Sequence, residues 1–465
     1  MDDNYLEEEL FDYTMLDDLD CIDETEIQVT EYQTVVDLPK KITFIVKDIE
    51  DINANSACYT NLSELSDTGR LRFHDTIASC TTRGGDSDMV IEDCRKLILK
   101  QLHLQEKEWS VIFTSNATES LNMATALIYN YTRNNKINYR YFVSAFAHNS
   151  LYLPAQKQSI IYKHNLEIFD IFNVSMFKNS VISIPYIDNI LGFNHWKSCF
   201  NQVKLKEMGI HSKSQNTIID NTHIIVDAAQ AGLTLFNPVF NQLHPRNRWK
   251  FLPKLDFVSA IALSGHKFHA PHIGILVIRK EFIEQDLFLI PEIKVGGGAV
   301  SYISTNPNKA SKLLNNHDGL ESGLINTESI YGLYNWLLCL SAINNNFLET
   351  PSIARVWFKN QIHKNLSNFT VIDRQLLDTK FKNILSGNNI ILIDCGAYFS
   401  VDVVNALKLN NIESRDGSFC CDLAIDQLNL SNNLLRLSFD YTFTKAKAEK
   451  IFNVLLTLNN EINKI

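Results

Sequence analysis

The chain has 465 residues, a length that suits two packed domains better than a single hydrophobic core. Its shares of hydrophobic residues, 45%, and of charged residues, 21%, are ordinary for a soluble globular protein. No apolar run reaches the ~18 residues that a membrane-spanning helix needs. The acidic N-terminus also lacks the basic and apolar regions of a secretory signal. We therefore expect a cytoplasmic protein that does not enter a membrane.

The formal net charge of −10 comes from one end of the chain. Residues 1–39 contain 14 acidic residues and no lysine or arginine, so the rest of the chain carries a net charge of +4. Because that part shows no basic stripe, we do not expect nucleic-acid binding. Residues 1–40 combine acidic with aromatic and aliphatic side chains, a composition typical of disorder. This acidic tail either keeps the protein soluble or docks on a protein partner.

The nine cysteines are scattered along the chain, and none belongs to a Cys-x-x-Cys pair. This spacing argues against a zinc site and against a disulfide framework. It favours a reducing compartment, in which cysteines stay free for packing or for chemistry. We therefore expect no metal.

The first predicted elements lead to a candidate anion site. Residues 41–84 contain a short strand-like run and a polar stretch, and we expect them to pack near the active site or to form a small domain. Apolar residues at helical spacing then predict a helix over 91–102. A buried strand over 110–114 follows, and a turn of small residues leads from it into another helix. Backbone N–H groups at this helix start, around Ala117 and with the Thr118 hydroxyl, would suit a phosphate, and a plain Ser/Thr N-cap is the alternative.

Two further predicted strands, over 140–146 and 180–185, are each followed by a polar side chain. His148 follows the first strand, where a histidine is either a satisfied structural residue or a catalytic one. Asn189 follows the second strand and precedes Gly192, a pair that by itself indicates only a turn. We take His148 and Asn189 as candidate site residues.

Asp227 directly follows an apolar β run over 224–226. An aspartate at this position either caps a helix or, as a carboxylate at a buried strand end, needs a cationic partner. A protonated pyridine nitrogen would serve as that partner. Gln230, three residues further on, is placed to donate a hydrogen bond to the same ligand.

One lysine lies in a short turn between two apolar strands. A β-branched run leads into the turn, the strand over 274–278 leads out of it, and the turn contains Ser264, His266 and Lys267. A lone lysine beside a strand is usually solvated. The apolar strands, small residues and histidines around Lys267 instead indicate a lined cavity. Desolvation there would lower the pKa of the lysine, and a neutral amine can form a Schiff base.

The C-terminal part opens with a long helical pattern from about residue 328. Cys420 and Cys421 lie in a polar, glycine-containing loop, where a thiolate would be accessible, although cysteines are commonly buried packing residues. Arg436 lies in an apolar strand over 434–439. It is either a structural ion-pair partner or a bidentate contact for a substrate carboxylate.

Four motifs follow one another along the chain: Thr-Ser-Asn-Ala-Thr-Glu-Ser at 114–120, Asp-Ala-Ala-Gln at 227–230, Ser-Gly-His-Lys at 264–267 and Arg-Asp-Gly-Ser-Phe-Cys at 415–420. Together they resemble the cysteine desulfurases, which are pyridoxal 5′-phosphate (PLP) enzymes of the class V aminotransferase group. The sequence His-Asn-Ser at 148–150 resembles the corresponding segment in the desulfurase domain of the molybdenum-cofactor sulfurases. The chain departs from the family pattern at Asn116, where the family has glycine. It departs again at Leu324, where the family has a threonine that binds phosphate across the dimer.

The resemblance implies an α/β protein of PLP-dependent fold type I, similar to aspartate aminotransferase. Its large PLP-binding domain, expected over 85–330, would contain a mostly parallel seven-stranded sheet. A small α+β domain over 331–465 would carry the catalytic cysteine loop. The resemblance also implies a homodimer.

The resemblance further implies a cofactor, PLP, and a role for each matched residue. Lys267, Cys420 and His148 would be catalytic, and Asn189 and Arg436 would bind the substrate. The residues implied to bind PLP are Ala117, Thr118, His148, Asn189, Asp227, Gln230, Ser264, His266 and Lys267.

The implied reaction converts L-cysteine to L-alanine and leaves a persulfide on Cys420, from which the sulfur passes to an acceptor protein or cofactor. Two alternatives stay open. One is a selenocysteine lyase or another class V PLP lyase. The other is a PLP-binding interaction protein without desulfurase turnover.

Overall fold

The structure is a computed structural model, and it describes residues 36–37, 43–44, 52–53, 85–135, 137–169, 179–195, 221–236, 258–323, 325–342, 350–372, 390–439 and 443–462. The chain divides into two compact units, residues 1–48 and 49–465. In the first unit, β1 (Val36–Asp37) pairs antiparallel with β2 (Thr43–Phe44). The expectations for the acidic tail before β1 and for Leu324 lie outside the described residues. None of the helices in these ranges has the length and apolar character that crossing a bilayer requires.

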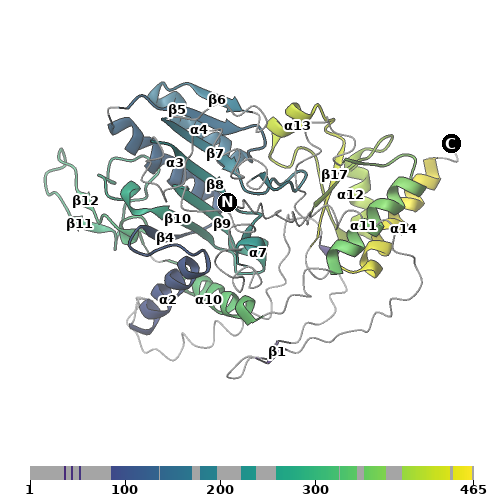
Figure 1. Cartoon of the computed structure of the whole chain (residues 1–465), viewed down its shortest axis with the longest axis horizontal. Helices are drawn as coiled ribbons and strands as arrows, with labels where there is room; N and C mark the ends of the chain where they lie inside the picture. The colour runs from purple at the N-terminus through teal and green to yellow at the C-terminus, as the bar shows by residue number, and fades with distance from the viewer. Residues whose placement is uncertain are drawn as a thin grey trace, which may run out of the picture. The chain divides into compact units, whose positions relative to one another are not determined.

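The second unit contains a seven-stranded sheet, which confirms the predicted fold class (Figure 1). Six strands run in one direction, and β10 runs antiparallel to both of its neighbours. In order across the sheet the strands are β4 (Trp109–Thr114), β10 (Gly274–Arg279), β9 (Ala260–Ser264), β8 (His223–Asp227), β7 (Ser180–Pro185), β5 (Arg140–Ser144) and β6 (Leu166–Phe169).

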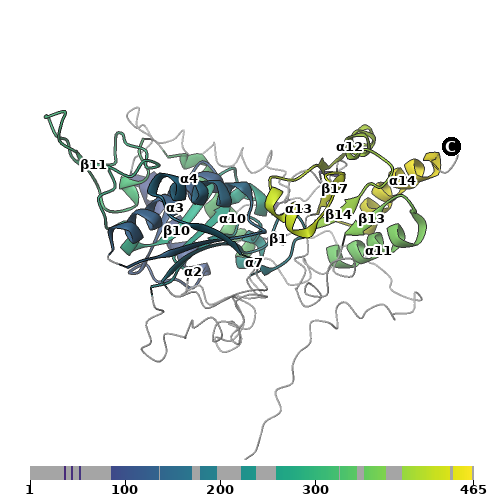
Figure 2. The ribbon, with the colours of Figure 1, turned by 90° about the horizontal axis from the view of Figure 1, so that it is seen from above.

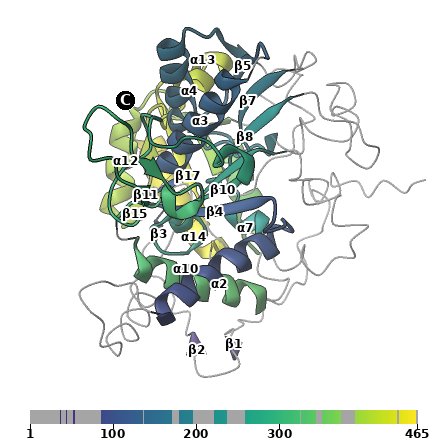
Figure 3. The same cartoon turned by 90° about the vertical axis from the view of Figure 1, so that its left-hand side faces the viewer.

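The inner strands are buried along almost their whole length, which is why they read as continuous apolar runs in the sequence. Helix α3 (Ala117–Asn134) packs over β8, β9 and β10 and against α4 (Asn149–Tyr162), as Figure 2 shows from above. Helix α2 (Gly85–Gln101) packs against α10 (Thr327–Ala342), and the two lie side by side in Figure 3. Shorter elements complete this part: α7 (Gly232–Leu235), η5 (Gly265–Phe268), η6 (Lys280–Phe282), β11 (Val300–Tyr302), β12 (Lys312–Leu313) and η7 (His317–Gly319).

The C-terminal part builds a second, antiparallel sheet with its own apolar core. Its strands, in order, are β13 (Thr370–Ile372), β14 (Ile390–Asp394), β17 (Leu434–Ser438) and β16 (Arg415–Asp416). Its helices are α11 (Thr350–Asn365), α12 (Ser400–Leu409), α13 (Asp422–Leu428) and α14 (Lys445–Ile462). Apart from this sheet, β15 (Ile412–Glu413) pairs parallel with β3 (Ile52–Asn53). The segment boundaries expected from the sequence remain predictions.

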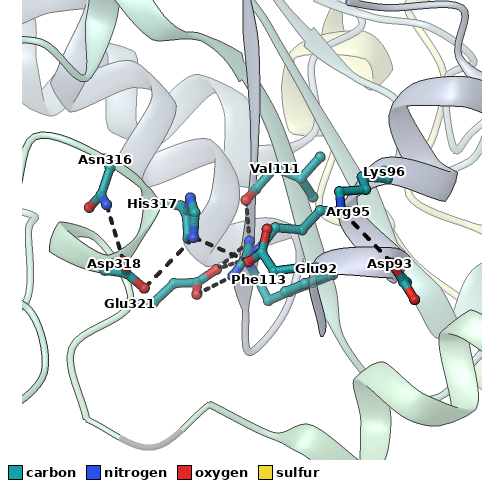
Figure 4. Close-up of polar contacts among 10 residues, drawn as sticks. All are labelled: Glu92, Asp93, Arg95, Lys96, Val111, Phe113, Asn316, His317, Asp318 and Glu321. Carbon is teal, nitrogen blue, oxygen red and sulfur yellow. Dashed lines mark hydrogen bonds and ion pairs between the residues drawn. The ribbon is translucent and has the colours of Figure 1, made fainter. Parts of the chain in front are cut away.

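A buried ion pair ties α2 to the sheet and to the segment after η7 (Figure 4). Arg95 on α2 donates to both carboxylate oxygens of Glu321, at 3.0 and 2.7 Å, and also to the carbonyl of Val111 in β4. Glu321 in turn accepts from the N–H of Phe113 at 2.6 Å. Burial acts against the charge on Arg95, but the carboxylates of Glu321 and Glu92 outweigh it and raise the pKa of the guanidinium.

Removing one member of this pair leaves the other as an uncompensated buried charge. We therefore expect Glu321→Gln to lower the free energy of unfolding by about 3–5 kcal/mol. The matched control is Glu92→Gln: Glu92 also pairs with Arg95, at 3.0 Å, but its side chain is 43% exposed. Its loss should cost no more than about 1 kcal/mol. Urea unfolding of both variants measures the difference, and equal losses would contradict this account of the buried pair.

Candidate active site

The carboxyl ends of the parallel strands meet at one edge of the sheet, where a pocket is found. It is lined by segments that follow β4, β5, β7, β8 and β9. Among the residues that line it are all nine for which the sequence resemblance implies PLP binding: Ala117, Thr118, His148, Asn189, Asp227, Gln230, Ser264, His266 and Lys267. The structure therefore gathers in one cavity residues that are up to 150 positions apart in the sequence.

The first residue of β10 aligns two of these segments. Gly274 lies opposite Thr114 at the end of β4 and opposite Ser264 at the end of β9. A Cβ on Gly274 would lie 2.1 Å from Thr114 Oγ1 and 2.3 Å from the Asn116 carbonyl oxygen. Only glycine permits so close an approach. The turn after β4 and the turn after β9 are thus held at a fixed spacing by one residue without a side chain.

The turn after β4 opens helix α3 and presents free backbone donors to the pocket. Asn116 is the N-cap, and its Oδ1 accepts from the N–H of Glu119 at 3.0 Å. The next two N–H groups, of Ala117 and Thr118, donate to no described residue. Such donors at the start of an 18-residue helix form an anion site. The asparagine that stands where the resembling family has glycine therefore caps the helix.

His148 also lines the pocket, at the start of α4. It is the N-cap of that helix, and its Nδ1 accepts from the N–H of Ser150 at 3.0 Å. Burial lowers the pKa of His148, and the nearby Asp227 carboxylate opposes that effect only in part. The neutral ring therefore carries its hydrogen on Nε2. The structural role of His148 is therefore observed, and its role in the site stays a prediction.

Asp227 ends β8 and is 7% exposed. Its Oδ1 accepts from the N–H of Ala229 at 3.0 Å, and no other hydrogen bond to it is found among the described residues. A carboxylate with so little solvent exposure is suited to a cationic hydrogen-bond donor. The pairing of Asp227 with a protonated ring nitrogen stays a prediction, and the carboxylate has room in its hydrogen bonding for such a donor.

Lys267 lies in η5, between β9 and β10. The next residue anchors this turn, because the Phe268 ring packs against Phe236 and the Phe268 carbonyl accepts from Trp336 Nε1 at 2.6 Å. On the other side, burial lowers the pKa of His266 to about 4, so its ring is neutral at pH 7. Its Nδ1 lies 3.1 Å from Ser264 Oγ. The lysine is thus carried by a turn fixed at both ends.

Cys420 and Arg436 are not among the residues that line the pocket. Hydrogen bonds nevertheless join Arg436 to a lining residue and Cys420 to the neighbour of one. The N–H of Asn149, next to His148, donates to the Cys420 carbonyl at 2.8 Å. Arg436 Nη1 donates to the carbonyl of Asn189 at 2.9 Å. Cys420 is exposed, whereas the neighbouring Cys421 is fully buried.

Sequence reasoning missed Asp188, which lines the pocket beside Asn189. Its Oδ1 accepts from three successive N–H groups, those of Ile190, Leu191 and Gly192. Its Oδ2 accepts from the N–H of Phe193 and from His195 Nε2, at 2.9 and 2.8 Å. One carboxylate therefore fixes the whole loop after β7. The pattern Asp-x-x-x-Gly signals a turn, but it does not show that one side chain collects all these donors.

The family described as aminotransferase class V matches residues 254–451. The fold resembles the cysteine desulfurase CsdA of Escherichia coli, with a TM-score of 0.64 and 17% identity over 89% of this chain and 95% of that one. It resembles equally the cysteine desulfurase of Thermococcus onnurineus, with a TM-score of 0.66 and 18% identity over the same shares. The chain has the fold of the cysteine desulfurases.

A NifS-like protein of Rickettsia africae shows the same fold, with a TM-score of 0.59 and 16% identity over 89% of this chain and 100% of that one. No curated protein matches the sequence. The predicted fold, PLP-dependent fold type I, is thus confirmed, and the resemblance to the cysteine desulfurases holds at the level of the fold. The particular likeness to molybdenum-cofactor sulfurases stays a prediction. The matched family region contains Lys267, Cys420 and Arg436.

The groups in the pocket fit PLP. The unbonded N–H groups of Ala117 and Thr118 suit its phosphate, and the carboxylate of Asp227 suits its pyridine nitrogen. Lys267 would supply the amine for covalent attachment, and the neutral ring of His148 suits the face of an aromatic cofactor. These fits come from the chemistry of the donors and acceptors present in the pocket.

The spacing role of Gly274 is open to a direct test. Gly274→Ala should weaken PLP binding at least tenfold, because the added methyl group must displace Thr114 or Asn116 at the phosphate turn. It should also lower the free energy of unfolding by about 1–3 kcal/mol. In the matched control, Gly297→Ala, the added Cβ meets nothing within 4 Å. PLP titrations and urea unfolding compare the two variants, and unchanged affinity in Gly274→Ala would refute the role.

Proposed function

We propose that the chain is a PLP-dependent cysteine desulfurase, which converts L-cysteine to L-alanine and transfers the sulfur to Cys420. The observation that carries the proposal is the pocket itself. A lysine, a strand-end carboxylate and the N-terminus of a long helix converge there from β9, β8 and β4. The fold shared with cysteine desulfurases and the family match over 254–451 support the same reaction class.

The residues that would hold PLP follow from their chemistry. The start of α3, at Ala117 and Thr118, takes the phosphate, with Ser264 and His266 beside it in the pocket. Asp227 pairs with the ring nitrogen, and Gln230 donates to the ring oxygen. Bound in this way, PLP supplies an electron sink that stabilises negative charge at the substrate Cα.

The substrate carboxylate requires a cation. Arg436 is the guanidinium joined to the pocket wall, through its hydrogen bond to the Asn189 carbonyl. A bidentate contact from Arg436 would orient L-cysteine with its Cα towards Lys267. Lys267 Nζ then moves the Cα proton, and His148 Nε2 is placed to exchange protons with substrate or cofactor.

Sulfur transfer is the task of Cys420. Its thiolate attacks the substrate sulfur, the carbon–sulfur bond breaks, and the electron pair of that bond stays with the substrate carbon. That carbon is then protonated, so the products are L-alanine and a persulfide on Cys420. Because Cys420 is exposed, the persulfide is accessible to an acceptor protein or cofactor. A homodimer and an acidic tail that docks a partner belong to the same proposal.

The proposal predicts the products of one incubation. With PLP and L-cysteine, the protein should release alanine and gain one sulfur atom, which mass spectrometry locates on Cys420. Cys420→Ser should keep PLP bound and lose the persulfide. Lys267→Ala should lose covalent PLP attachment, measured by borohydride reduction and peptide mapping.

Other outcomes favour other functions. Elemental selenium released from L-selenocysteine without turnover of L-cysteine favours a selenocysteine lyase. Covalent PLP with no turnover of either substrate favours a PLP-binding interaction protein. A reduced PLP adduct on a lysine other than Lys267 contradicts the proposed site.

A further inference from the structure

Both atoms of the Asn189 side-chain amide contact the turn that carries Cys420. Oδ1 accepts from the Cys421 thiol at 2.6 Å, and Nδ2 donates to the Phe419 carbonyl at 2.9 Å. The carbonyl can only accept, so it fixes which end of the amide faces it, and the thiol must then be the donor to the other end. Asn189 is 7% exposed, so water competes little for either bond.

The turn needs such contacts because its backbone is strained. Phe419 and Cys420 have φ angles of +56° and +58°, in the left-handed region that residues with a Cβ avoid. Each such residue costs on the order of 1–2 kcal/mol. In this conformation of the turn the two cysteine side chains point to different surroundings. The Cys420 side chain is exposed, and the Cys421 side chain is fully buried.

Cys421 is suited to act as the donor. Burial raises the pKa of its thiol well above the ordinary value, so the S–H is retained at neutral pH. Its backbone is held separately from its side chain. The Cys421 N–H donates to the Ser418 carbonyl, and the Cys421 carbonyl accepts from Ala424 at the start of α13, both at 3.0 Å. A change of side chain at this position therefore removes no backbone donor or acceptor, so the exchange rate of the Cys421 N–H reports how firmly the turn is held.

We propose that the hydrogen bond between Cys421 and Asn189 is a latch that holds the 418–421 turn in the conformation that presents the Cys420 thiol. Asn189 and Cys421 are then positioning residues, which act on sulfur transfer through the geometry of Cys420. The effect of the latch on sulfur transfer rests on the proposed desulfurase function. The hydrogen bond itself forms in the protein without substrate.

Two variants of Cys421 separate the hydrogen bond from packing. Replacement of Cys421 by serine or by alanine removes the sulfur atom and its packing contacts in both cases. Only serine keeps a hydrogen-bond donor, its hydroxyl group. In the PLP-loaded protein without substrate, Cys421→Ala should speed hydrogen exchange of the Cys421-position N–H by roughly five- to tenfold. Cys421→Ser should stay close to the wild-type rate. Asn189→Asp, which replaces the donor to Phe419 with an oxygen, should loosen the turn in the same way as Cys421→Ala.

A kinetic measurement adds the functional consequence. In a single turnover with L-cysteine, Cys421→Ala should slow persulfide formation on Cys420, whereas Cys421→Ser should not, and PLP affinity should be unchanged in both. Equal exchange rates in the serine and alanine variants would overturn the latch, whatever their activity. A wild-type protein that forms no persulfide on Cys420 would refute the proposed function, and the exchange rates would still decide whether the latch exists.

Discussion

The site depends on a close approach of backbone segments that Gly274 permits. Because β10 runs between β4 and β9 and antiparallel to both, its first residue lies beside the last residues of those two strands. Gly265 allows a second close approach, since a Cβ there would lie 2.4 Å from the Pro271 carbonyl oxygen. The helix that offers N–H groups and the turn that carries Lys267 therefore meet across one strand. The other strands add their own terminal residues to the same edge of the sheet.

Much of this arrangement could be predicted from the sequence. Strands buried on both faces appear as uninterrupted apolar runs, so the segments before Asp227 and around Lys267 are visible without a structure. In a parallel sheet, residues that follow such runs gather at one edge. That rule explains why the pocket contains the predicted residues after β4, β5, β7, β8 and β9.

The remaining features depend on contacts between residues far apart in the chain, and local patterns do not encode them. Arg95 and Glu321 form an ion pair although they are 226 positions apart, and the sequence around neither residue identifies the other as its partner. Asn189 and Cys421 are 232 positions apart. The sequence resemblance assigned the catalytic role to Cys420, but nothing in the sequence indicated that Cys421 would bond to Asn189. Likewise, the five donors gathered by Asp188 reflect the folded loop rather than a recognisable motif.

The most direct test of the account is the position of PLP in a crystal structure of the protein grown with the cofactor. We expect continuous density between PLP and Lys267 Nζ, with the phosphate at the N–H groups of Ala117 and Thr118 and the ring nitrogen at the Asp227 carboxylate. Cofactor density attached to a different lysine, or a phosphate bound away from the start of α3, would contradict it.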